Sequence, residues 1–173
     1  PTGTVSVTNG GSFNLNNTSS VVLQGDTTLS QAGAVNWPEL DLGGKVLTLG
    51  STVSSFTIEK AFTIANGESL SSGSGNVTLQ GALTLNGEIK QGGGILDVFK
   101  GGTVGGTGRL DVSDSELKLG AALNISGTLA ANSASQWSGW AGKVDLSAGT
   151  LEAAGGSLSL SDFTTGVGTT LKL

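Results

Sequence analysis

Apolar and polar residues alternate along most of this chain in a short unit, apolar–polar–apolar. Because successive side chains of an extended strand point to opposite faces, each unit places its apolar residues on one face and its polar residue on the other. Apolar residues do not recur with the spacing of a helix, so the pattern predicts an all-β protein built from short strands. The units include Val5-Ser6-Val7, Leu47-Thr48-Leu49, Phe56-Thr57-Ile58, Phe62-Thr63-Ile64, Val77-Thr78-Leu79, Leu83-Thr84-Leu85, Leu110-Asp111-Val112, Leu117-Lys118-Leu119, Leu123-Asn124-Ile125, Val144-Asp145-Leu146, Leu158-Ser159-Leu160 and Leu171-Lys172-Leu173.

The spacing of these units favours one β architecture over another. Units start six or seven residues apart, as at 56 and 62 or at 77 and 83, whereas strands of antiparallel sandwiches usually recur about every 8–12 residues. A short strand followed by a glycine-containing corner suits a coil that bends and continues. We therefore predict a single parallel β-solenoid (β-helix) domain over residues 1–173, with coils of roughly 20 residues and a length of about 40 Å. An antiparallel β-sandwich is the alternative.

Irregular sequence interrupts the alternation at about 26–44 and 131–142. We interpret both segments as loops that project from the rod, where solenoids often carry their binding surfaces. All three tryptophans, Trp37, Trp137 and Trp140, fall in these segments. A loop tryptophan can stack on a sugar, anchor a protein contact or cover its own coil, so these residues are the candidate binding residues.

Composition and charge exclude several classes of partner. The formal net charge is −5, and the eight Lys and Arg residues are scattered singly. Since binding to phosphates needs several cations on one face, we expect no nucleic-acid partner. No apolar run approaches the roughly 18 residues that a membrane helix needs, so we expect no membrane insertion.

The chain also lacks the residues of most catalytic and metal sites, since it contains no His and no Cys. These absences exclude Ser-His-Asp and Cys-His arrangements and the usual zinc ligands. The segment 105–111 only partly matches a calcium-binding glycine–aspartate repeat, and Asp111, Asp145 and Glu152 occupy outward positions where charge serves solubility. We therefore expect no enzyme activity, no metal and no cofactor.

Units such as Gly127-Thr128-Leu129, Gly149-Thr150-Leu151-Glu152 and Gly156-Ser157-Leu158 make the chain from about Lys45 onward similar in composition to a group of bacterial surface proteins. The sequence resembles the passenger regions of autotransporters and of two-partner-secreted filamentous adhesins. This resemblance implies a right-handed parallel β-helix, an extracellular or cell-surface location, and adhesion or scaffolding without catalysis. Its partners would be protein assembly partners or surface glycans.

The sequence leaves other functions open. A virion component, such as a capsid decoration protein or a tail-spike or fibre segment, would also be β-rich and free of cysteine, and it would be a homo-oligomer, typically a trimer. A carbohydrate-binding or carbohydrate-active β-helix is a further, minor alternative. A start at Pro1 fits either a piece of a longer secreted protein or a chain made without a leader.

Overall fold

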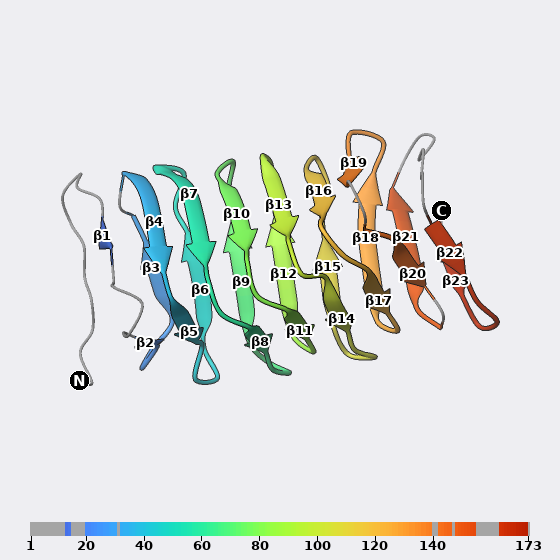
Figure 1. Cartoon of the computed structure of the whole chain (residues 1–173), viewed down its shortest axis with the longest axis horizontal. Helices are drawn as coiled ribbons and strands as arrows, with labels where there is room; N and C mark the ends of the chain where they lie inside the picture. Colours follow the sequence, from blue (N-terminus) through green and yellow to red (C-terminus); the bar gives the residue numbers. More distant parts are fainter. Residues whose placement is uncertain are drawn as a thin grey trace.

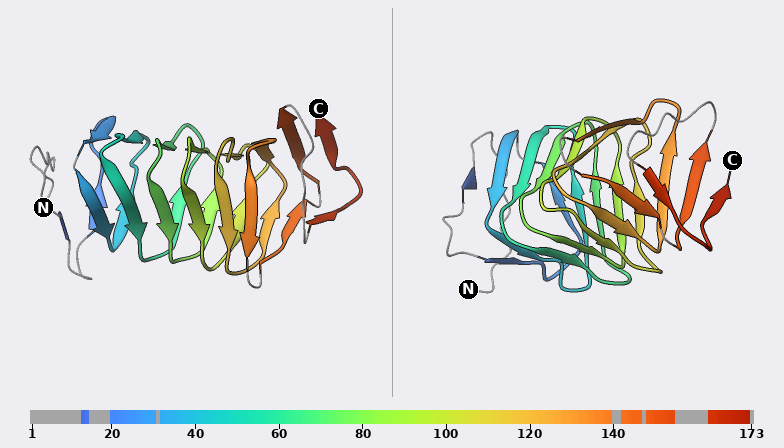
Figure 2. Two further views of the ribbon diagram at one scale, coloured as in Figure 1. Left: turned by 90° about the horizontal axis from the view of Figure 1, so that it is seen from above. Right: turned by 45° about the vertical axis from the view of Figure 1, so that its right-hand side comes forward.

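The strands of this protein follow one another around a coil that advances along a single axis. The computed structural model describes residues 13–14, 20–30, 32–139, 142–146, 148–154 and 163–172. In these ranges the chain is all-β without helix, and parallel strands stacked about 21 residues apart form a β-solenoid of about seven turns. Figure 1 shows the coils side by side from one terminus to the other, and Figure 2 shows the same stack from above and from an oblique side. The predicted parallel β-solenoid is confirmed, and the antiparallel sandwich is wrong.

Each complete coil contributes one strand to each of three parallel sheets, which we call sheets 1, 2 and 3. Sheet 1 contains β1 (Phe13–Asn14), β4 (Gly33–Trp37), β7 (Val53–Ile58), β10 (Asn76–Leu79), β13 (Ile95–Val98), β16 (Glu116–Leu119) and β19 (Gln136–Gly139). Sheet 2 contains β8 (Phe62–Ile64), β11 (Leu83–Leu85), β14 (Gly102–Val104), β17 (Leu123–Ile125), β20 (Val144–Leu146) and β22 (Phe163–Thr165). Sheet 3 contains β3 (Thr27–Leu29), β6 (Val46–Leu49), β9 (Ser69–Ser72), β12 (Glu88–Gln91), β15 (Arg109–Asp111), β18 (Thr128–Asn132), β21 (Thr150–Ala154) and β23 (Thr170–Lys172). A separate pair is formed by β2 (Ser20–Val22) and β5 (Glu39–Asp41).

Side chains at equivalent positions of successive coils stack in columns inside the solenoid. In sheet 1, Val77 aligns with Phe56, 21 residues earlier, and with Leu96, 19 residues later. All of these side chains are fully buried. In sheet 2, the outward residues Thr63, Thr84 and Thr103 align in the same way and are exposed. The alternation seen in the sequence thus separates the core from the surface.

Polar side chains at the corners hold one coil to the next. The Ser115 hydroxyl donates to the Gln91 carbonyl oxygen at 2.8 Å, and the Ser126 hydroxyl donates to the Val104 carbonyl oxygen at 3.2 Å. Inside the solenoid, the Gln91 side-chain amide donates to the Gly75 carbonyl oxygen at 2.7 Å. These side-chain hydrogen bonds join successive coils and add to the backbone hydrogen bonds at the same corners, so they stabilise the stack.

The loops predicted at about 26–44 and 131–142 are largely strands. The first segment contains β3, β4 and β5, and the second contains the end of β18 and all four residues of β19. In the first segment Val35 and Trp37 alternate inward on β4, and Pro38 lies at the corner, where its missing N–H leaves no ladder bond unmade. Both loop predictions are therefore wrong for these strands. The tryptophan and proline residues suggested loops, although the alternation of inward and outward residues continues through these strands.

The far end of sheet 3 shows where the inward column stops. Leu171 of β23 aligns with Leu151, which is buried, but Leu171 itself is 58% exposed. In the described part of the chain, β23 is the last strand of this sheet, so no further strand packs beside Leu171. The predicted units at 5–7 and 158–160 lie outside the described residues. No helix in the described ranges is long and apolar enough to span a membrane.

Candidate functional site

Trp37 lies in the core rather than in a loop. Its side chain is 3% exposed, and its ring meets the ring of Phe56 edge to face, with the centroids 5.1 Å apart. The ring therefore presents no surface to a ligand. Its indole nitrogen is buried and has no hydrogen-bond partner among the described residues. This geometry gives Trp37 a packing role, in which the edge-to-face contact contributes beyond burial alone.

Trp137 lies on β19, where it aligns with Leu117. Its side chain is partly buried and packs against the core, and its indole nitrogen is also buried without a hydrogen-bond partner in the described structure. Five strand spacings in sheet 1 separate β4 from β19, about 24 Å. Trp37 and Trp137 therefore do not form one site. A binding role for Trp137 stays a prediction, and Trp140 lies outside the described residues.

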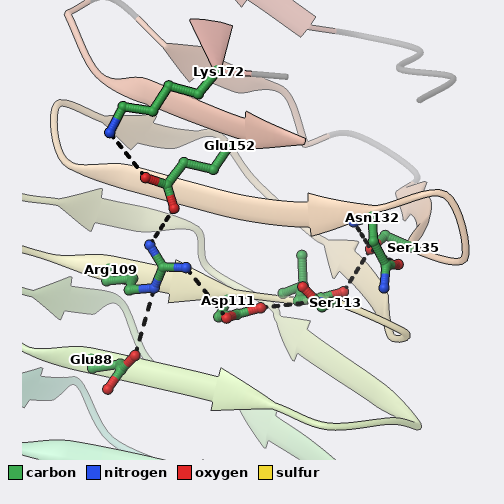
Figure 3. A network of polar contacts seen from close by, with 9 residues as sticks. Glu88, Arg109, Asp111, Ser113, Asn132, Ser135, Glu152 and Lys172 are labelled. Atoms are coloured by element: carbon green, nitrogen blue, oxygen red, sulfur yellow. Dashed lines mark hydrogen bonds and ion pairs between the residues drawn. The ribbon is translucent and has the colours of Figure 1, made fainter. Parts of the chain in front are cut away.

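A charged network covers the outer face of sheet 3 (Figure 3). The Arg109 guanidinium donates through Nη1 to Glu152 Oε2 at 2.6 Å. It also lies 3.5 Å from Asp111 Oδ2, measured from Nη2, and 3.6 Å from Glu88 Oε1, measured from Nε. Lys172 Nζ completes the row by donating to the second Glu152 oxygen at 3.1 Å. Each coil from β12 to β23 except that of β18 contributes to this network.

Ala130 of β18 explains how Arg109 reaches a strand two places away. It aligns with Asp111 on one side and with Glu152 on the other. Leu129 and Ala131 point inward, so Ala130 points outward, yet it is only 5% exposed. Because the side chain of Ala130 is short, it leaves room on the outer face for the long side chain of Arg109 to reach Glu152.

The network shifts the pKa of two of its members, Glu152 and Arg109. Hydrogen bonds from Arg109 and then from Lys172 lower the pKa of the Glu152 carboxyl below its ordinary value. The hydrogen bond to Glu152 is the main reason why the pKa of the Arg109 guanidinium is raised. A general acid needs a raised pKa, so the environment of Glu152 opposes that role.

Acid should weaken the solenoid partly through Glu152. Because its pKa is depressed in the folded state, its ionised form stabilises the fold above the unfolded-state pKa of about 4.3, and this contribution disappears as pH falls through the folded-state pKa. We expect the melting temperature of Glu152→Gln to fall less steeply than that of the parent protein below about pH 4.3. Thermal melts at a series of pH values measure this slope. Glu88→Gln is the matched control, because the Glu88 carboxylate belongs to the same network but lies farther from Arg109, 3.6 Å from Nε. An equal change in slope for both variants would contradict the assignment of this acid sensitivity to Glu152.

Asp97 is the other described acid with a resolved shift, and it lies on β13 of sheet 1. Burial raises its pKa, Lys118 at 4.0 Å lowers it, and Glu116 raises it. Hydrolysis by a pair of carboxyl groups requires that the two groups lie about 5–10 Å apart and flank the bond that is cleaved. Glu152 and Asp97 lie on different sheets of the rod, so they do not form such a pair. Within the described ranges, no group of three or more acidic side chains could hold a metal ion.

A hollow of about 400 Å³ lies at the corner where sheet 1 leads into sheet 2. Glu59, Gln80 and Phe99 follow directly after β7, β10 and β13, so three successive coils line it together with Thr78 and Lys100. Phe99 is 52% exposed. The Asn36 side-chain amide donates to Glu59 Oε1 at 2.9 Å, which positions one carboxylate at the hollow. This corner combines an accessible ring with donors and acceptors.

A second hollow, of about 380 Å³, lies at the corner between sheets 2 and 3. Its charged groups already have partners. Arg109 belongs to the network described above, and the buried Glu68 carboxylate accepts from the backbone N–H groups of Gly44 at 2.6 Å and Ala65 at 2.7 Å. Because these charged groups already bind other parts of the protein, the hollow beside Phe99 is the stronger candidate for binding a ligand.

Phe99 is not among the binding residues predicted from the sequence, although its outward position could be inferred. Val98 continues the inward column of sheet 1, so the next residue must point outward. The sequence could therefore have placed Phe99 on the surface, but a single exposed hydrophobic residue does not by itself indicate a site, so the hollow around it is visible only in the structure.

The chain matches no family model, no curated protein and no solved structure. The resemblance to autotransporter and filamentous-adhesin passenger regions therefore stays a prediction that rests on composition, and the fold places this chain among β-solenoids without indicating a specific function.

Proposed function

We propose that this chain is a non-catalytic structural and adhesive module of a bacterial cell-surface or secreted filamentous protein. The observation that carries the proposal is the continuous parallel register of the three sheets. Each strand of the three sheets pairs only with strands of the neighbouring coils, so a rod of this kind gains length coil by coil without a new core. Such a rod can act as a spacer and can present its outer faces to partners. These partners would be proteins of the same assembly or surface glycans.

The chemistry of the outer surface is consistent with this role. The described acid with the lowered pKa is held by cations, and the one with the raised pKa lies on another sheet. Outward positions on sheet 2 carry Thr63, Thr84 and Thr103, which are short, uncharged side chains that suit a strand surface. These features support a scaffold that displays side chains over an activity that transforms a substrate.

Mass and shape in solution test the proposal against the virion alternative. We expect light scattering to give the mass of one chain, 17.0 kDa, because the exposed large hydrophobic residues in the described part of the chain, Val22, Phe99, Val167 and Leu171, form no broad apolar surface for a trimer. Small-angle X-ray scattering should show an elongated particle, since the eight strands of sheet 3 span about 34 Å. A compact trimer would favour a capsid decoration or fibre protein and overturn the proposal.

A further inference from the structure

Phe99 is an exposed aromatic residue, and no other exposed large hydrophobic residue lies beside it in the described part of the chain. The other large hydrophobic residues that are exposed in the described structure are Val22, Val167 and Leu171, and these lie in the first and last described coils. A protein contact built on apolar burial would need a contiguous patch of several hundred Å² around the ring. Around Phe99 the hollow offers polar and charged groups instead.

The groups around the ring provide hydrogen bonds of both kinds. The Glu59 carboxylate accepts, the Lys100 ammonium donates, and the Gln80 amide does both. Within the described residues, the side chains of Gln80 and Lys100 have no hydrogen bond or ion pair, so both are available to a ligand. The acid and the lysine balance in formal charge, which favours a neutral ligand over an anion or a cation.

We infer that the hollow formed by Glu59, Thr78, Gln80, Phe99 and Lys100 binds a neutral saccharide chain; this inference rests on the proposed adhesive function and names its ligand class. A pyranose ring has a face of C–H groups, which packs on an aromatic ring, and an edge of hydroxyls, which both donate and accept. The Asn36 bond to Glu59 holds an acceptor in place before binding, and this lowers the entropy cost of recognition.

The placement of the lining residues also suggests how a chain of sugars would lie. Glu59, Gln80 and Phe99 come from three successive coils, and adjacent strands lie about 4.8 Å apart. The lining therefore extends along the rod axis rather than around one coil. A linear oligosaccharide lying along this corner would place one ring on Phe99 and the hydroxyls of the next two units at Gln80 and Glu59.

The test uses cellohexaose, maltohexaose and xylohexaose as probes of the complete chain, with saturation-transfer NMR and calorimetric titration. We expect at least one of them to bind at millimolar concentration. Phe99→Ala should weaken that binding about tenfold and Phe99→Trp should preserve it. Gln80→Ala should weaken it by a smaller factor. Val167→Ala, which removes an exposed apolar residue elsewhere, is the matched control and should bind like the parent.

Absence of binding to all three probes, or equal binding by the parent and Phe99→Ala, would overturn the inference. Self-association that Phe99→Ala abolishes, without sugar binding, would assign the residue to a protein contact and overturn it too. Thermal melts of each variant ensure that a loss of binding is not a loss of fold. A monomeric rod that binds no sugar would leave the proposed structural role intact, whereas a trimer that binds sugar would overturn that role and keep the saccharide site.

Discussion

We expect Leu83→Asp to lower the free energy of unfolding by about 4 kcal/mol or more, whereas Thr84→Asp on the next residue leaves it nearly unchanged. Leu83 is 1% exposed on β11, where it aligns with Phe62 in the preceding coil. Aspartate there loses the apolar contacts and leaves a carboxylate among hydrocarbon groups. Urea unfolding followed by circular dichroism measures the difference.

Thr84→Asp is a closely matched control because it places the same side chain on the same strand. Thr84 is exposed, and it aligns with Thr63 and Thr103, neither of which is charged. The new carboxylate therefore stays in water and meets no charge of the same sign in register. Similar losses in the two variants would contradict the division into inward and outward residues on which the solenoid depends.

The alternation of apolar and polar residues was sufficient to predict the fold, because every coil separates inward from outward side chains in the same way. A three-residue strand such as β11 buries its first and third side chains and exposes its middle one, and this pattern is visible without knowing any contact. Parallel stacking followed from the short intervals between units, which leave no room for the longer strands of a sandwich. The sequence therefore predicted both the class of fold and the sides of most strands.

Trp37 shows where residue identity misled the prediction. A tryptophan followed by a proline suggested an irregular loop, but Val35 and Trp37 occupy the inward positions of β4 and Pro38 lies at the corner. The period of two was present there as elsewhere. Giving the alternation priority over residue type would have located Trp37 in the core.

The Arg109 network could not be predicted because it depends on the register between coils. Arg109 and Glu152 are 43 residues apart, and the distance from one coil to the next varies, as the steps from Leu110 to Leu129 and from Leu129 to Leu151 show. The alternation places Glu152 on the outer face, but an error of one residue in a coil length would change which outward residues of other coils lie beside it. The same uncertainty kept the lining of the Phe99 hollow out of reach, although the outward position of Phe99 itself could be inferred.

A column of glycines at the corner before sheet 3 controls how closely the coils stack. Four successive coils carry this glycine directly before the sheet 3 strand, at Gly87, Gly108, Gly127 and Gly149. A Cβ atom on Gly127 would lie 2.1 Å from the Gly105 carbonyl oxygen and 2.3 Å from the Gly108 carbonyl oxygen. Both atoms belong to the backbone of the preceding coil, so no side chain can rotate away. Glycine is therefore required at this position because there is no space for a Cβ atom.

We expect Gly127→Ala to lower the free energy of unfolding by about 3 kcal/mol, because the coils must separate locally to admit the methyl group. Gly106→Ala is the control, since a Cβ atom there meets no atom within 4 Å, and its effect should stay within about 0.5 kcal/mol. Because each coil is stabilised by its neighbours, the damage should remain between the coils of β15 and β18. Hydrogen exchange should then report faster opening of amides such as Thr128 N–H, which donates to the Gly108 carbonyl oxygen at 2.8 Å. Equal stability of Gly127→Ala and Gly106→Ala would show that the coils can move apart freely, and that close stacking is not what makes glycine necessary at this corner.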